Sequence, residues 1–167
     1  MLMGGTFAAI WHPVEVLVIA GAGASGIACA KMLYSTGARI TELLDLDVDD
    51  LDPVVYDLVI DGTDNFATRY LLNDACVLLK RPLVYGALHR FDGQVSVYDL
   101  RDDDAPCYHC LFPEADDVEE ANCATMGVFA PVVGIIGSMQ AAEALKLLSG
   151  VGESLSGRLL WLDVRTM

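Results

Sequence analysis

Short apolar runs alternate along this chain with longer amphipathic stretches. The short runs are rich in β-branched and other large apolar residues, as in strands covered on both faces of a sheet; they lie at residues 14–20, 56–61, 82–88 and 159–163. The longer stretches predict helices, with glycine or proline near their ends; they lie at residues 25–36, 66–80 and 132–149. Strands that alternate with helices predict an α/β fold with a largely parallel sheet.

Three other segments break this alternation. Residues 90–100 predict an antiparallel hairpin arm, because apolar positions alternate beside Asp92-Gly93, which is a turn signal. The acidic segment 42–53 is ambiguous and fits either a strand with a loop or one helical turn. Residues 102–122 are polar and irregular, which predicts a loop.

Composition fits one domain and argues against nucleic acid as a partner. The chain has 167 residues, of which 54% are hydrophobic, so a sizeable core can form. Its formal net charge is −14, from 10 basic and 24 acidic residues. Binding to a phosphate backbone needs clustered Lys and Arg, and the sequence contains no such cluster.

Cysteine usage and the first residues favour a reducing compartment. The five cysteines are an odd number, and residues 1–5 lack the positive region and apolar run of a signal peptide. We therefore expect a cytoplasmic protein. The uncharged segment 124–142 is long enough to raise the question of a membrane span. Its Gly and Pro residues favour a buried helix, so no membrane partner is expected.

A glycine-rich loop follows the first predicted strand. Gly21, Gly23 and Gly26 form a Gly-x-Gly-x-x-Gly pattern between that strand and a helix, the context in which this pattern is informative. The glycines permit a tight turn and let the backbone approach a phosphate, which the N–H groups at the start of the helix can bind. We therefore expect a single Rossmann-like domain over residues 1–167, with an irregular segment at 1–13 and a cysteine-bearing loop at 101–125.

Acidic residues follow the next two strands. Asp45 or Asp47 lies where a dinucleotide dehydrogenase places its ribose-binding acid, so a nicotinamide-dependent oxidoreductase is one alternative. An Asp-Gly-Thr-Asp-Asn motif ends a buried strand, where ligands bind in open α/β sheets. Its Asp64 is expected to face the glycine loop and suits Mg²⁺ beside phosphates. The other interpretation is that Thr63, Asp64 or Asn65 only caps the following helix.

The cysteines fall into two groups. Cys107 and Cys110 have the spacing of a thiolate pair that grips Zn²⁺, although one pair is half of a site, and free cysteines are the alternative. Cys123 lies in a loop before a helix, where a lowered pKa would suit a nucleophile; a buried, inert thiol is the alternative. Cys29 and Cys76 lie on helix faces and are interpreted as buried and inert.

Seven segments in order resemble one known family. They are the glycine loop, residues 56–65 with Arg69, and residues 82–87, 93–98, 106–110, 122–127 and 131–138. Together they resemble the HesA/MoeB/ThiF family, the adenylyltransferases of molybdopterin and thiazole biosynthesis and relatives of ubiquitin-activating enzymes. The resemblance extends over residues 14–37 and 56–163.

The resemblance implies an activity. Family members bind Mg-ATP and adenylate the C-terminal Gly-Gly of a ubiquitin-like sulfur carrier protein, and sulfur is then delivered to make a thiocarboxylate. A homodimer is also implied, with the apolar stretch 126–148 as one contact. Residue by residue, the resemblance and the motifs place Gly21, Gly23, Gly26, Asp45, Asp64 and Asn65 at the nucleotide, Asp64 on Mg²⁺, Cys107 and Cys110 in half of a zinc site, and Cys123 in acyl or persulfide chemistry.

The sequence also departs from the family pattern. Residues 40–55 stand where the family has a longer segment with phosphate-binding Arg and Lys, and they contain neither residue type. Residues 1–13 lack the Arg that relatives donate across the dimer, no second Cys-x-x-Cys follows, and the glycine loop reads Gly-Ala-Ser-Gly. The second function to consider is therefore an impaired or altered family member that binds a carrier or a nucleotide without turnover.

Overall fold

Six strands in the described part of the chain form one mixed sheet. The computed structural model describes residues 17–20, 29, 40–43, 57–113 and 127–167. The strands are β1 (Leu17–Ala20), β2 (Ile40–Leu43), β3 (Leu58–Asp61), β4 (Pro82–His89), β5 (Asp92–Asp99) and β6 (Leu159–Asp163). Their order is β2-β1-β3-β4-β5-β6, in which β1 to β4 pair in parallel and β5 and β6 add antiparallel. The predicted α/β class with a largely parallel sheet is confirmed.

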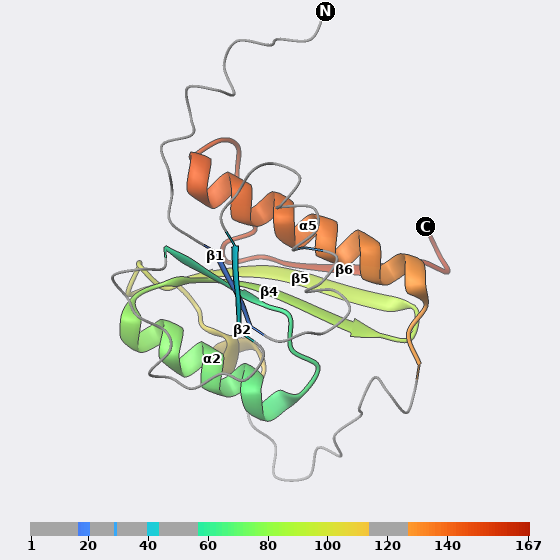
Figure 1. Ribbon diagram of the computed structural model, residues 1–167, viewed down its shortest axis with the longest axis horizontal. Coiled ribbons are helices and arrows are strands. Elements are labelled where there is room, and N and C mark those ends of the chain that lie inside the picture. The colour runs from blue at the N-terminus through green and yellow to red at the C-terminus, as the bar shows by residue number, and fades with distance from the viewer. Residues whose placement is uncertain (1–16, 21–28, 30–39, 44–56, 114–126) are drawn as a thin grey trace, which may run out of the picture.

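Helices cover both faces of the sheet (Figure 1). One face carries α2 (Phe66–Leu79) and the short helix α3 (Tyr108–Leu111), and the opposite face carries α5 (Ala130–Ser149). Strand β3 contributes side chains to the core on each side of the sheet. Val59 packs in the core beneath α2, whereas Leu58 and Ile60 belong to the core beneath α5. The uninterrupted apolar run of β3 follows from this burial on both sides.

Helix ends follow the local signals in the sequence. α2 ends at Lys80, which adopts a left-handed conformation with φ +53°. α5 has Pro131 in its first turn and ends at Gly150, where φ is +66°. The helices predicted at 66–80 and 132–149 are therefore confirmed within two residues at each end.

α5 is long and apolar enough to cross a membrane, judged by length and composition alone. In the fold it covers the sheet, and its buried residues include Gln140 and Glu143. Gln140 bonds to the backbone of β3 and Glu143 accepts from the Leu155 N–H. These contacts account for polar residues in an otherwise apolar helix that packs on a sheet.

The predicted turn of the hairpin is wrong. Asp92 and Gly93 lie inside β5, paired with His89 and Leu88 of β4. The turn is Arg90 and the residue after it, and Arg90 takes the positive φ of +53°. Gly93 has a packing role, because an added Cβ there would overlap the side chain of Ile136 in α5. The predicted antiparallel hairpin is otherwise confirmed: it consists of β4 and β5, and both strands belong to the sheet.

The described part of the segment predicted as a cysteine-bearing loop, residues 101–113, contains the short helix α3. Residues 108–111 form the single turn of α3, which begins directly after Cys107. Tyr108 is buried among α2, β4 and β5 and supplies the anchor that polar composition alone did not reveal.

A glycine in β4 lets α5 approach the sheet. An added Cβ at Gly86 would overlap the carboxamide of Gln140. We expect Gly86→Ala to lower the free energy of unfolding by about 1–3 kcal/mol, as overpacking does. The matched control is Gly134→Ala in α5, where a Cβ meets no described residue within 4 Å and removal of glycine should stabilise the helix by roughly 0.5–1 kcal/mol. Urea unfolding measures both, and equal effects of the two substitutions would contradict this explanation.

Candidate functional site

The strand order reverses at β1, which lies between β2 and β3. Ligands of open α/β sheets bind outside the carboxyl ends of the strands at such a point. Ala20, the last residue of β1, is the register partner of Asp61, the last residue of β3. Ala20, the residue before the glycine loop in the sequence, therefore lies beside the first residue of the Asp-Gly-Thr-Asp-Asn motif. The remaining residues that the sequence assigns to this site or to its chemistry, namely Gly21, Gly23, Gly26, Asp45 and Cys123, lie outside the described residues.

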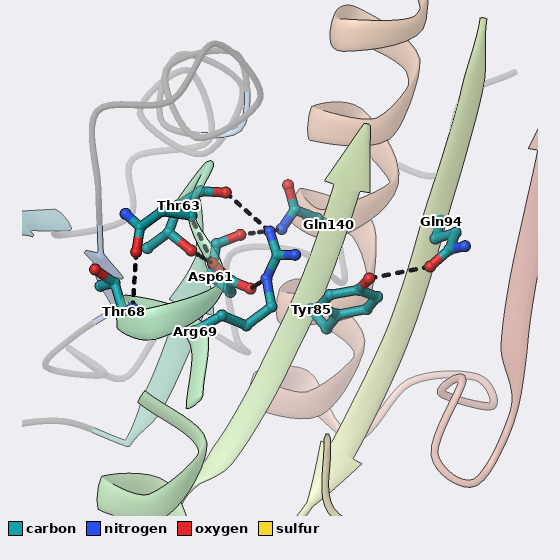
Figure 2. A network of polar contacts seen from close by, with 8 residues as sticks. Asp61, Thr63, Thr68, Arg69, Tyr85, Gln94 and Gln140 are labelled. Carbon is teal, nitrogen blue, oxygen red and sulfur yellow. Dashed lines mark hydrogen bonds and ion pairs between the residues drawn. The ribbon is translucent and has the colours of Figure 1, made fainter. Parts of the chain in front are cut away.

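Asp61 is the centre of a buried polar network (Figure 2). Its carboxylate has no exposed surface. One oxygen accepts from the Thr63 backbone N–H at 2.9 Å and from the Thr63 hydroxyl at 2.6 Å. The other oxygen accepts from Arg69 Nε at 2.8 Å, which is also an ion pair. Arg69 Nη2 in turn donates to the Thr63 carbonyl at 3.0 Å. The turn after β3 is thus held at its start and at its middle.

Arg69 is buried beneath aromatic rings. Its guanidinium carbon lies 5.1 Å from the ring centroid of Tyr85, 5.9 Å from that of Tyr108 and 6.0 Å from that of Phe66. Burial alone would lower the pKa of Arg69, but charge interaction with the Asp61 carboxylate, followed by Tyr85 and Tyr108, raises it above its usual value. The side chain therefore stays charged in the interior. Aromatic faces attract such a cation and shield it from solvent.

Gln140 completes the network from the opposite face of the sheet. Its Nε2 donates to the backbone carbonyl of Asp61 at 2.7 Å. The side chain is fully buried, and its Oε1 has no hydrogen-bond partner in the part of the chain that the structure describes. Gly86 leaves the space that this carboxamide occupies. α5 and α2 therefore hold the same strand end from opposite sides.

Asp64 and Asn65 have different surroundings. The Asn65 side chain caps α2 by accepting from the Thr68 N–H at 2.8 Å. Thr63 instead donates its N–H and its hydroxyl to Asp61. Asn65 is therefore the capping residue among the three candidates for the helix cap. Asp64 is exposed, and within the described residues its carboxylate makes no hydrogen bond or ion pair. A single available carboxylate fits Mg²⁺, which is usually bound through one or two carboxylates plus phosphate oxygens.

Cys107 and Cys110 lie together in the turn that forms α3. Their sulfur atoms are 3.6 Å apart, and hydrogen bonds from Cys107 lower the pKa of the Cys110 thiol. Among the described residues, no group of three or more potential metal ligands gathers, so the cysteine pair by itself is not a complete zinc site. His109 is directed to α2, with Nδ1 3.2 Å from Asn73 Nδ2, and its ring stacks on Tyr70.

Cys29 and Cys76 are fully buried, as predicted. Burial raises the pKa of both thiols to about 12. The structure therefore gives neither of them the exposure or the thiolate character that a nucleophile needs.

The buried pair at this site, Asp61 and Arg69, was not predicted from the sequence. Arg69 was noticed as part of a motif and Asp61 as the end of a strand, but their pairing was not inferred. The sequence did contain a signal for this pair: an Asp ends an apolar strand, and an Arg lies on the next helix. Both charges need a partner once they are buried. Gln140 gave a weaker signal, as a polar residue within an apolar helix.

Sequence comparison matches residues 49–167 to the model of the ThiF family. The chain belongs to the ThiF family. It is 52% identical over 112 residues to the sulfur carrier protein adenylyltransferase of Thermus thermophilus, covering 65% of this chain and 41% of that protein. It is 53% identical over 111 residues to the adenylyltransferase and sulfurtransferase MOCS3 of Caenorhabditis briggsae, covering 66% of this chain and 27% of that protein. The chain thus spans less than half the length of these relatives.

Solved structures with the same fold include MccB of E. coli. A crystal structure of MccB with MccA gives a TM-score of 0.74 at 16% identity, covering 97% of this chain and 65% of that one. MccB with ATP gives 0.66 at 17% identity, covering 86% of this chain and 59% of that one. At this level of identity the likeness shows the Rossmann-type fold of this ThiF-family chain, in agreement with its sheet order.

The helix cap gives a direct test of the role of Asn65. We expect Asn65→Ala to lower the free energy of unfolding by about 1 kcal/mol, because the Thr68 N–H loses its acceptor. Asn65→Asp should retain most of the stability, since a carboxylate caps as well. Urea denaturation compares the two variants. A loss of equal size in both would show that the cap does not determine the effect.

The buried thiols predict a decline of stability in alkali. The folded state keeps Cys76 neutral up to about pH 12, whereas an unfolded thiol ionises near pH 9. This stabilising contribution is fully present below pH 9 and is lost as the pH rises towards 12, by at most about 1.4 kcal/mol per pH unit. We expect Cys76→Ala to show a shallower decline than the wild type in urea unfolding between these pH values. Parallel declines would contradict the role of Cys76.

Proposed function

We propose that this chain is the adenylating part of an enzyme that uses ATP to activate the C-terminal Gly-Gly of a ubiquitin-like sulfur carrier protein. Membership of the ThiF family and the names of the relatives support the substrate class. The observation that carries the proposal is the pairing of Ala20 with Asp61. This pairing supports the proposal because Ala20 directly precedes the glycine loop in the sequence and Asp61 begins the turn that contains Asp64.

The nucleotide is proposed to lie at this strand edge. Gly21, Gly23 and Gly26 would offer backbone N–H groups to its phosphates at the start of a helix. Asp45 follows β2, whose last residue Leu43 is also the register partner of Ala20, so it is suited to the ribose. Asn65, proposed from sequence as a further contact, has its side-chain oxygen committed to the helix cap. Its side-chain amide nitrogen is the group that remains for a ligand.

Mg²⁺ is proposed to bind Asp64 together with phosphate oxygens of ATP. When bound, the ion neutralises phosphate charge, which favours attack by another anion. The exposed, uncommitted carboxylate fits this task. The nearest buried carboxylate, Asp61, is already satisfied by Thr63 and Arg69 and is not available to a metal.

The proposed reaction joins two anions. A carboxylate oxygen of the carrier attacks the α-phosphorus of ATP, the bond from that phosphorus to the bridging oxygen breaks, and pyrophosphate leaves. The carrier is left as an acyl-adenylate. The contribution of the chain is to position both groups and to stabilise the charge that develops on phosphate.

The cysteines, the assembly and the location complete the proposal. Cys123 would take part in acyl or persulfide chemistry, in a pathway of molybdopterin or thiamine type. Cys107 and Cys110 would supply half of a zinc site, with the other ligands from elsewhere. We also propose a homodimer in the cytoplasm that uses the apolar stretch 126–148.

One observation favours a second candidate function. Residues 40–55 contain no Arg or Lys, so this segment offers no cation to the phosphates. A chain with this lack could bind a carrier or Mg-ATP without turnover, because removal of cationic groups lowers rates of phosphoryl transfer strongly. Binding measured together with exchange separates the two functions.

Asp64 is the residue to change first. We expect Asp64→Asn to lower ATP–pyrophosphate exchange, measured with a carrier that ends in Gly-Gly, by ~100-fold or more, the scale of preorganised charge stabilisation. Stability should stay unchanged, because the side chain is exposed. The matched control is Asp57→Asn, an exposed aspartate at the other end of β3.

Three outcomes of this experiment are informative. Retained exchange in Asp64→Asn would show that the assignment of Asp64 is wrong. Carrier binding by the wild type without any exchange would favour the second function. Quenching of NADH fluorescence at micromolar protein would instead favour an oxidoreductase.

A further inference from the structure

We propose that Arg69 is a positioning residue for the metal: through Asp61 and Thr63 it fixes the turn that presents Asp64, without touching metal or nucleotide. This inference rests on the proposed function for the role of Asp64. Its structural part, that Arg69 fixes the turn, can be tested separately.

The first argument is the way in which Arg69 spans the turn. Its Nε donates to the Asp61 carboxylate at the strand end, at 2.8 Å. Its Nη2 donates to the Thr63 carbonyl, at 3.0 Å. One rigid guanidinium thus joins the first and third residues of the motif, and the next residue is Asp64. A lysine has a single ammonium group and cannot reproduce this planar fork.

The second argument is that the inward polar groups of the turn are satisfied from inside the protein. Thr63 donates both its N–H and its hydroxyl to Asp61. The Asp61 carbonyl accepts from Gln140. The backbone on the Asp61 side of Asp64 is therefore restrained by side chains from both faces of the sheet, and on the other side Asn65 begins α2. Asp64 is the exposed residue between two fixed points.

The third argument excludes direct contact with a ligand. The Arg69 side chain is 7% exposed and the Asp61 side chain is 0% exposed. The rings of Tyr85 and Tyr108 lie over the guanidinium. A phosphate or metal at the exposed Asp64 therefore cannot contact the Arg69 side chain, and the turn is the structural connection between them. Outer partners of this kind typically change metal affinity by roughly 10- to 100-fold when they are replaced.

The experiment uses Arg69→Lys, which keeps the buried charge. Calorimetry would measure ATP binding by the wild type and the variant over a range of Mg²⁺ concentrations. We expect the Mg²⁺ concentration for half-maximal effect to rise by roughly 10- to 100-fold, while ATP binding without Mg²⁺ stays unchanged. Hydrogen exchange of the ligand-free protein supplies the second measurement. The Thr63 amide should lose protection, because its acceptor is no longer held in place.

Two further variants guard against general destabilisation. Glu143→Gln is the matched control, because Glu143 is also a buried carboxylate that accepts from a backbone N–H, that of Leu155. It should affect neither Mg²⁺ dependence nor Thr63 exchange. Should Arg69→Lys fail to fold, the double variant Asp61→Asn with Arg69→Met removes both buried charges together and leaves neither unpaired. Its results are interpreted in the same way.

The outcomes separate this inference from the proposed function. Wild-type Mg²⁺ dependence and wild-type Thr63 protection in Arg69→Lys would overturn the inference. A shifted Mg²⁺ dependence in Arg69→Lys but not in Asp64→Asn would overturn the part that acts through Asp64. Absence of Mg-ATP binding by the wild type would refute the proposed function, and Thr63 exchange would still decide whether Arg69 fixes the turn.

Discussion

A carboxylate without exposed surface must find partners inside the protein, and Asp61 imposes that requirement at the end of β3. Thr63 and Arg69 satisfy its two oxygens. Arg69 in turn needs an anion and a shielded place for its own charge, which the surrounding aromatic rings provide. Removal of one partner would leave the other charge buried and alone. The local arrangement is therefore determined as a whole, and the exposure of Asp64 is one of its results.

The need to shield the Arg69 charge also connects the site to the turn of α3, which carries the two neighbouring cysteines. Tyr108, between Cys107 and His109, packs near Arg69 and Tyr85. Its backbone N–H donates to Asn73 Oδ1 at 2.8 Å, which ties the turn to α2. These contacts hold the start of α3 without any metal ligand. The aromatic cluster therefore serves both the guanidinium and the thiol pair.

Much of the fold could be predicted from sequence because its signals are local. The apolar run of β3 and the Pro131 and Gly150 signals around α5 led to the correct elements. The error at Gly93 has a physical cause. A glycine that gives room to Ile136 looks the same in sequence as a glycine that makes a turn.

The site was less predictable because its decisive contacts are tertiary. Thr63, Asp64 and Asn65 are all good capping residues, and only the geometry of the turn selects Asn65. Asp64 was predicted from its place after a strand to face the glycine loop, and its exposure is a finding of the structure. Gln140 could not be assigned to Asp61 from sequence, because the two residues are separated by 79 positions and meet only when α5 lies on the sheet.

The contacts of Asp61 differ in how far apart the two partners lie along the chain, and this difference affects the order of folding. Asp61 and Arg69 are eight positions apart, and Thr63 and Arg69 are six apart. Closing such short loops costs little chain entropy, whereas the contact from Gln140 must await a distant part of the chain. The ion pair belongs to a strand–turn–helix unit that can assemble early. The Gln140 carboxamide adds rigidity to a strand end whose turn the ion pair already fixes.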